Sequence, residues 1–351
     1  MRTVNDSKRC QALLTPEIVA MLTQIHEYKG EQASILADKA EMLAPLAEMA
    51  RVQSTEASNR MEGVSASDSR IRKLVLDKTT PRTRDERKIA GYRDVLTAVQ
   101  ENYAYLPPKT SVILQMYHDL GKYSGGALGG VYRSTDGGAG EEGTPGRRIS
   151  PQPVPAEEIP QAMERLCASF DEALRNPVMD PLLLTPLFVL DFLCIQPFHG
   201  GNGPMSRLLT LLLLDRAGYL VGNYISLEKR IEETREAYDK ALRRSSAGWR
   251  EERNRDIPFV GYVLETVLAS YRELSRQIQR LPASGVSKPD RVREMIKGAP
   301  GRITKAEILE GCSDISQVTV QRALMELRKS GEIIKLGGGR YTAYIWNRER
   351  K

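Results

Sequence analysis

Residues 196–207, QPFHGGNGPMSR, combine the residue types that bind phosphate. Gly200, Gly201 and Gly203 leave the backbone free to turn its N–H groups inward at the start of the helix expected next. The positive end of a helix attracts anions, and Arg207, one turn into it, is placed to close over a phosphate. The spacing therefore predicts an anion-binding loop, although many glycine-rich loops before helices are only turns.

The same segment resembles the signature of the Fic (Fido) family, H-x-F-x-[D/E]-G-N-G-R-x-x-R. The resemblance extends from about residue 51 to residue 280 in the order and spacing of elements. It implies transfer of AMP from ATP to a hydroxyl group of a target protein. It also implies roles within the signature: the histidine is the general base, the acid holds magnesium, and the loop and arginines bind phosphates.

The sequence keeps five of the eight defined signature positions and departs at three. Gln196 stands in place of the base, Gly200 in place of the acid and Pro204 in place of the first arginine. Glutamine cannot accept a proton near neutral pH, and loss of a general base typically costs about 10²–10⁴ in rate. We therefore expect weak ATP binding that depends little on magnesium, impaired transfer and no structural metal. The residues that the resemblance assigns to nucleotide binding are Phe198, Gly201, Asn202, Gly203 and Arg207.

His199 is the one imidazole near this loop, and it occupies a variable position of the signature. It is a candidate surrogate base, while a structural or solvent-facing role is the more common one for such a histidine. An active transferase with altered chemistry, using Gln196 or His199, is therefore an alternative to a catalytically impaired protein.

A second resemblance lies upstream, in the sequence SNRMEG. It is similar to the inhibitory pattern [S/T]-x-x-x-E-[G/N] of many Fic proteins. Ser58 and Glu62 are one helical turn apart and share a face, and Gly63 is an expected helix end. The resemblance implies that residues 54–63 form an inhibitory helix in which Glu62 pairs with Arg207 and blocks the γ-phosphate position. Alone, such a pattern usually marks only a helix end.

Apolar residues recur at helical spacing along most of the chain, which predicts a mainly α-helical fold with a Fic-type core. A glycine-rich stretch interrupts it, and residues 131–133 and 148–150 flank a polar tip as in a β-hairpin. At about 131–149 this hairpin corresponds to the flap where the family docks a target protein by strand addition; a surface loop is the alternative. Helices are expected at 16–51, 55–60, 85–103, 111–123, 156–175, 182–195, 204–217, 227–244 and 258–281, with Pro204 as the first helical residue.

The chain divides into an N-terminal helical region (1–104), a Fic-like core (105–281), a linker (282–289) and a C-terminal domain (290–351). In the last, helices are expected at 290–297, 304–311 and 316–330, and strands at 332–336 and 341–346. Three helices followed by a glycine-tipped hairpin is the order of a winged helix.

The basic surplus of the chain lies in this domain. The net charge is +6, and from Val286 onward 14 Lys/Arg stand against 8 Asp/Glu, so the preceding residues are neutral overall. In a winged helix the third helix enters the major groove and the wing contacts the DNA backbone. A DNA-binding regulator with the Fic-like core as a scaffold is thus a third interpretation, although such domains also bind proteins. The candidate DNA contacts are Gln317, Thr319, Gln321, Arg322 and Arg340.

The composition argues against a disulfide-rich, secreted or membrane-spanning protein. The four cysteines are scattered, so neither a disulfide framework nor a zinc site is indicated, which favours a reducing compartment. The N-terminus has no apolar signal region. The most apolar run, 208–214, is far shorter than the ~20 residues of a membrane span.

We expect a cytoplasmic protein whose partners are a nucleotide, a target protein and DNA but no membrane. The sequence leaves its oligomeric state, a homodimer included, open.

Overall fold

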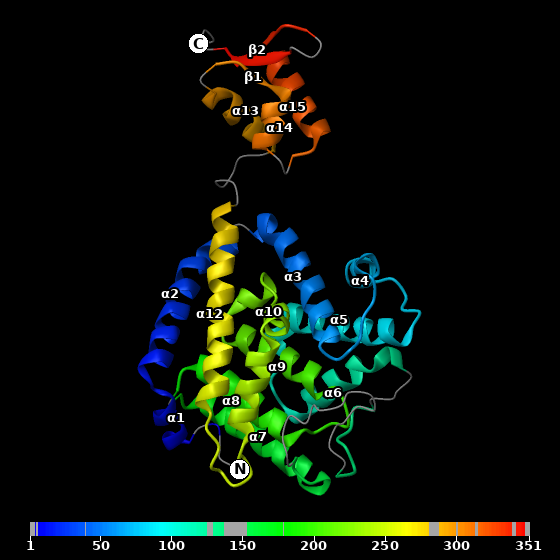
Figure 1. Cartoon of the computed structure of the whole chain (residues 1–351), viewed down its shortest axis with the longest axis vertical. Helices are drawn as coiled ribbons and strands as arrows, with labels where there is room; N and C mark the ends of the chain where they lie inside the picture. Colours follow the sequence, from blue (N-terminus) through cyan, green and yellow to red (C-terminus); the bar gives the residue numbers. More distant parts are fainter. Residues whose placement is uncertain are drawn as a thin grey trace. The chain divides into compact units, whose positions relative to one another are not determined.

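The structure is a computed structural model of the chain. It describes residues 4, 6–38, 40–124, 129–136, 153–177, 179–280, 288–299, 301–312, 315–338 and 342–347. These form two compact units, Met1–Ile278 and Gln279–Lys351, each of which is described by itself (Figure 1). The predicted mainly α-helical fold is confirmed.

The described part of the first unit is built from helices. The α-helices are α1 (Ser7–Leu13), α2 (Pro16–Asp38), α3 (Ala40–Arg60), α4 (Asp68–Val75), α5 (Arg84–Asn102), α6 (Thr110–Leu120), α7 (Ile159–Arg175), α8 (Pro181–Ile195), α9 (Asn202–Arg216), α10 (Leu227–Glu233), α11 (Arg235–Ser246) and α12 (Ile257–Arg280). Short 3₁₀ turns lie at Tyr103–Tyr105, Lys122–Ser124, Ala156–Glu158 and Leu220–Asn223.

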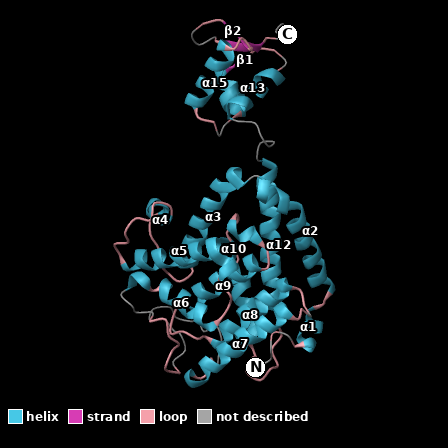
Figure 2. Cartoon of the chain, turned by 180° about the vertical axis from the view of Figure 1, so that it is seen from behind, coloured by secondary structure: helices cyan, strands magenta, loops and turns pink. Residues whose placement is uncertain are grey.

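Helix α8 lies between α7 and α9 (Figure 2). Every residue from Leu182 to Ile195 is buried, which explains why its sequence is apolar all round rather than on one face. The Asp180 carboxylate starts the helix by accepting the Leu182 N–H at 2.8 Å. Helices α7, α9 and α11 pack against it. The motif loop therefore begins at the end of a fully buried helix.

One cluster of charged residues lies inside this core. Arg9 of α1 donates hydrogen bonds to Asp191 of α8 and to Asp256 just before α12, each at 2.8 and 3.0 Å. The Trp249 indole N–H also donates to Asp191, at 2.7 Å. Burial alone would lower the pKa of Arg9, but the two carboxylates outweigh it and raise that pKa. Because buried charges are tolerated only when paired, this cluster ties α1 and the start of α12 to α8.

Several predicted boundaries differ from the structure. Helix α9 begins at Asn202, so Pro204 is its third residue rather than its first. The first four N–H groups of a helix have no partner within the helix, so the N–H that proline lacks costs no hydrogen bond at this position either. Residues 55–60 are the end of α3 and not a separate helix. The helix expected at 227–244 is two helices: α10 ends at Glu233 and α11 begins at Arg235, and the hydroxyl of Thr234 between them donates to the Arg230 carbonyl at 2.8 Å. The short helices α1 and α4 were not expected.

The expected flap hairpin is described only in part. Residues 131–136 form a loop rather than a first strand, and residues 137–152 lie outside the described part of the chain. The loop is fixed by Arg133, whose backbone N–H donates to the Pro197 carbonyl at 2.9 Å. This segment is thus attached to the motif loop by its own backbone.

The second unit contains the three helices and two strands that were predicted, and one further short strand. Its elements are α13 (Lys288–Gly298), β1 (Ile303–Thr304), α14 (Lys305–Gly311), α15 (Gln317–Lys329), β2 (Ile333–Leu336) and β3 (Ala343–Trp346). The strands form an antiparallel sheet in the order β1-β3-β2, with Ile303 opposite Tyr344 and Ile333 opposite Trp346. Thr304 caps α14 in a capping box with Glu307. A separate apolar core fills this unit.

Within the described residues, none of the helices is both long enough and apolar enough to cross a membrane.

Candidate functional site

Two left-handed backbone positions shape the motif loop. Gln196 ends α8 with φ 50° and ψ 65°, and its N–H donates to the Phe192 carbonyl at 3.0 Å. Gly201 precedes α9 with φ 76°. Left-handed backbone favours glycine, so Gly201 suits its position, while Gln196 is an uncommon residue there. The chain reverses between these two points and brings the loop to the N-terminal end of α9.

Phe198 and Asn202 hold the loop in this shape. The Phe198 ring is fully buried and stacks on Tyr117 with 3.6 Å between ring centroids. The Asn202 side chain accepts the Phe198 N–H at 3.1 Å and donates to the Phe198 carbonyl at 2.7 Å. Both residues therefore maintain the loop through buried contacts, and their nucleotide-binding role stays a prediction.

Arg207 is buried, with 3% of its surface exposed, and contacts the end of α3. It donates to the Ser58 hydroxyl at 2.8 Å, the Ser58 carbonyl at 3.1 Å and the Glu62 carboxylate at 2.8 Å. Burial opposes the charge of the guanidinium, but the Glu62 carboxylate outweighs this and raises the pKa of Arg207. The expected contact between Glu62 and Arg207 is present, and the next residue, Gly63, ends the turn with φ 74°.

Glycine is required at position 203 while this contact exists. A Cβ atom there would lie 2.7 Å from Glu62 Oε1 and 3.3 Å from Arg207 Nη1. The Glu62 carboxylate therefore lies directly against the backbone at the start of α9, where the loop was expected to bind an anion.

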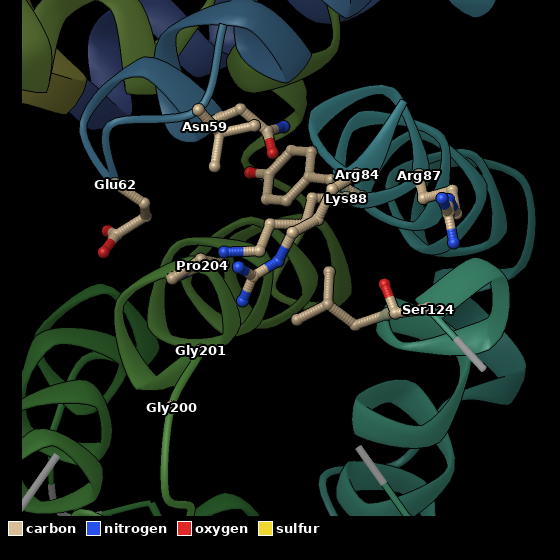
Figure 3. Close-up of a pocket in the computed structure, with 12 residues that line it drawn as sticks. Asn59, Glu62, Arg84, Arg87, Lys88, Ser124, Gly200, Gly201 and Pro204 are labelled. Atoms are coloured by element: carbon tan, nitrogen blue, oxygen red, sulfur yellow. The ribbon is translucent and has the colours of Figure 1, made fainter. Parts of the chain in front are cut away.

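A cavity of about 420 Å³ lies beside the motif loop (Figure 3). Its walls come from the chain around the end of α3, from α5, from the end of α6 and from the loop itself. The lining residues are Asn59, Glu62, Val64, Arg84, Arg87, Lys88, Tyr92, Leu120, Ser124, Gly200, Gly201 and Pro204. The wall is thus partly apolar and carries three cations from a single helix.

Gln196 and His199 are absent from the described lining of this cavity. Gln196 is buried below the loop, with 5% exposed, and its carbonyl accepts a hydrogen bond from Arg133 Nε at 2.8 Å. The His199 side chain is exposed. The structure thus brings Glu62, Gly201 and Arg207 together and leaves His199 outside the group.

The donor set does not fit a magnesium ion of the kind that the resemblance implies. Glu62 is the sole carboxylate in the described lining of the cavity, and it is bound to Arg207. Gly200 offers no side-chain oxygen, and the described residues contain no group of three His, Cys, Asp or Glu that could hold a metal. Magnesium at phosphate sites is usually held by one or two carboxylates together with water and the phosphates, and the one carboxylate of the described lining is already paired with Arg207.

Sequence reasoning missed Arg133, which supports the motif loop from below. Its guanidinium is buried and donates to the carbonyls of Gln196, Thr135 and Val154. Burial lowers the pKa of Arg133. Nothing in the spacing of the sequence marks this residue, because its partners are backbone carbonyls, and two of them, of Gln196 and Val154, are distant in the chain. The three cations of α5 were missed as well, although their i, i+3, i+4 spacing could have indicated a common face.

The candidate DNA contacts lie mostly on the exposed side of α15. Gln317, Gln321 and Arg322 are exposed. Thr319 is half-buried, and its hydroxyl lies 2.9 Å from the Ser316 hydroxyl, within the cap of the helix. Arg340 lies outside the described residues.

These features define a Fic-type fold: a buried helix, a glycine-rich loop and a second buried helix within a helical unit. Residues 107–214 match the model of the Fic/DOC family. This segment of the chain is therefore a domain of the Fic/DOC family, and the structures described next show that the fold around it is shared as well.

Solved structures of Fic proteins share the fold at low sequence identity. A Fic family protein from Desulfovibrio desulfuricans is 20% identical with a TM-score of 0.64, over 96% of this chain and 98% of that one. A Fic domain containing signaling protein from Bacteroides thetaiotaomicron is 18% identical with a TM-score of 0.59, over 74% of this chain and 100% of that one. Fic-1 from C. elegans is 18% identical with a TM-score of 0.56, over 74% and 72%. Comparison with curated proteins gives no match.

Proposed function

We propose that this protein binds a phosphate-bearing nucleotide, ATP by the chemistry of its family, in the cavity beside the motif loop. The observation that carries the proposal is the contact between Arg207 and Glu62 against Gly203. A carboxylate and a phosphate oxygen make the same charge-assisted hydrogen bonds to a guanidinium. A site that accommodates the Glu62 carboxylate at the start of α9 is therefore suited to a phosphate when that carboxylate moves away.

AMP transfer is proposed to be strongly impaired. Gln196 cannot remove a proton from an attacking hydroxyl, and the cavity lacks the ligands for a magnesium ion. His199 is exposed and outside the described lining, which argues against its use as a surrogate base. The alternative of an active transferase with altered chemistry is correspondingly less well supported, because a base must reach the proton that it accepts.

Glu62 is proposed to act as an internal competitor of the nucleotide. Its contact with Arg207 has to break before Arg207 can bind an outer phosphate, so the free energy of that contact is subtracted from the free energy of binding. Replacement of Glu62 by a neutral residue should therefore tighten nucleotide binding without adding any new contact.

Titration calorimetry with ATP tests this proposal on wild type and on Glu62→Gly. Glu101→Gly is the control, because Glu101 is an exposed carboxylate at the far end of α5. We expect tighter ATP binding in Glu62→Gly alone. Absence of ATP binding in both wild type and Glu62→Gly would refute the proposal.

Incubation with labelled ATP tests the chemistry. Wild type and Glu62→Gly should show little self-modification. Adding the three family residues (Gln196→His, Gly200→Asp and Pro204→Arg) to Glu62→Gly should restore transfer, whereas Gln196→His alone should not. Substantial modification by the wild-type chain would favour the active transferase instead.

For the second unit we propose a winged-helix role in DNA contact through α15. The supporting observation is that Gln317, Gln321 and Arg322 are exposed on this helix in a unit with a basic surplus. Val318 and Met325, 75% and 67% exposed on the same helix, are the argument for a protein partner instead. Titration of the full chain with duplex DNA at about 50 and 200 mM salt separates the two, since binding through phosphate contacts weakens steeply with salt.

A further inference from the structure

The three cations in the wall of the cavity come from the first turns of α5. Arg84, Arg87 and Lys88 are spaced i, i+3, i+4, which puts them on one face of the helix. All three line the cavity. In Figure 3 the side chains of Arg84 and Lys88 extend from α5 towards Pro204 on the opposite wall, while Arg87 lies nearer Ser124. The lining residues that the structure describes thus carry three cations against one carboxylate.

The two acids of the same turn face other partners. The Glu86 carboxylate accepts hydrogen bonds from Arg70 at 2.7 and 2.8 Å and from the Arg82 N–H at 2.6 Å. Asp85 accepts the Ser65 N–H at 3.3 Å. Neither acid is in the described lining of the cavity. Cations near the positive end of a helix are unfavourable unless an anion offsets them, so this face of α5 favours the binding of an anionic ligand.

An unsatisfied buried donor belongs to Arg207, the residue that the lining residue Glu62 contacts. Arg207 Nη1 has no hydrogen-bond partner among the described residues, although Arg207 is only 3% exposed. It is the atom that a Cβ on Gly203 would approach to 3.3 Å. A buried donor without a partner is unfavourable. Arg207 is not itself in the described lining, but its partner Glu62 is, so an acceptor that replaces the Glu62 carboxylate reaches Arg207 from the cavity.

The wall formed by the motif loop lacks two side chains that the family signature would use to bind phosphate, the acidic residue and the first arginine. Gly200 provides no ligand for magnesium, Pro204 provides no cation, and both residues line the cavity. Arg84 and Lys88 extend towards Pro204 from the opposite wall.

We propose that Arg84 and Lys88, together with Arg207, hold the phosphate chain of the ligand directly, so that this site binds a di- or triphosphate without a metal ion. The ligand class is a multiply charged phosphate chain, with the apolar side chains of Val64, Tyr92 and Leu120 available to a nucleoside attached to it. This inference rests on the proposed nucleotide-binding function and assigns the charge-bearing residues of that site.

Calorimetry in the presence of EDTA tests the inference with two probes, ATP and inorganic tripolyphosphate. The chain used is Glu62→Gly, so that the carboxylate does not compete. It is compared with the same chain carrying Arg84→Gln and Lys88→Gln. The matched control carries Lys73→Gln and Arg82→Gln, which remove the same charges from exposed positions outside the described lining. Circular dichroism checks that each variant is folded.

We expect both probes to bind in EDTA, and the Arg84/Lys88 variant to bind each roughly ten- to a hundredfold more weakly, while the control is unchanged. Tighter binding of ATP than of tripolyphosphate would assign the ligand to the nucleotides. ATP binding that needs added magnesium, or that is equal in the Arg84/Lys88 variant, would overturn the inference and leave the proposed function intact. Failure of Glu62→Gly to bind ATP under any of these conditions would overturn both.

Discussion

The contact between Glu62 and Arg207 permits a quantitative prediction, because its two ends differ in burial. The Arg207 side chain is 2% exposed and that of Glu62 is 22% exposed. Glu62→Gln would leave a buried guanidinium without its carboxylate, which typically costs about 3–5 kcal/mol. Arg207→Met would leave a carboxylate that water can reach, together with the loss of two hydrogen bonds to Ser58, so a smaller cost of about 1–3 kcal/mol is expected.

The double variant should be less unstable than the sum of the single variants. With both charges removed no buried charge is left unpaired, and contacting residues typically show coupling of about 0.5–3 kcal/mol. We expect the coupling free energy to lie in the upper half of this range, because Arg207 is so fully buried.

The assay is urea unfolding followed by tryptophan fluorescence. The chain has two tryptophans, Trp249 in the first unit and Trp346 in the second. In a Trp346→Phe background the signal reports the first unit alone, so that a single transition can be analysed. Glu48→Gln, which neutralises an exposed carboxylate on the same helix α3, is the control and should have little effect.

Additive effects would refute this reasoning. If the single-variant losses simply sum, with coupling below a few tenths of a kcal/mol, Glu62 does not stabilise the Arg207 charge. The segment at Ser58–Gly63 would then be only a helix end, and the proposed competition with nucleotide would lose its basis.

Two further predictions concern the elements that position the site. Gly91→Ala should destabilise the first unit by about 3 kcal/mol, because its Cβ would lie 2.1 Å from the Leu120 carbonyl oxygen and neither backbone can yield cheaply. Gly30→Ala, where nothing lies within 4 Å, should instead stabilise the chain by about 0.5–1 kcal/mol; thermal unfolding of both variants checks the pair. The Arg70 guanidinium lowers the pKa of Glu86 to about 2 from its ordinary 4.5, so the ionised carboxylate stabilises the folded state above about pH 4.5, and this contribution is lost as the pH falls towards 2. Melting temperatures between about pH 6 and pH 3 should therefore fall less steeply for Glu86→Gln than for wild type, and parallel curves would contradict this.

The sequence predicts the long helices well because their apolar residues are dictated by the core. Helix α8 is the clearest case, since its apolar run and its bounds both follow from complete burial. Short elements could not be predicted in the same way. Helix α1 spans seven residues and strand β1 two, so neither shows a periodic pattern. Tertiary partners set their positions: Asp191 binds Arg9 of α1, and β1 pairs with β3.

The site was predictable where a local signature carries it. The contact between Glu62 and Arg207 follows from the two motifs taken together, and the left-handed Gly201 follows from the glycine-rich loop. The start of α9 was misplaced because Pro204 marks a helix start without fixing which of the first residues it occupies. The cavity cations on α5 and the buried Arg133 could not be found from one motif, since each contributes from a distant segment of the chain.

The buried salt-bridged cluster around Arg9 has a consequence for producing fragments of this protein. The family match covers 107–214, and α8 lies inside it, but Arg9 and Trp249, which bond to Asp191, lie outside. A fragment cut at the limits of the match would leave this carboxylate without either partner and would expose a helix that is apolar on every side. Such a fragment is expected to aggregate rather than fold. The unit Met1–Ile278, which contains both Arg9 and Trp249, is therefore the better choice for expression.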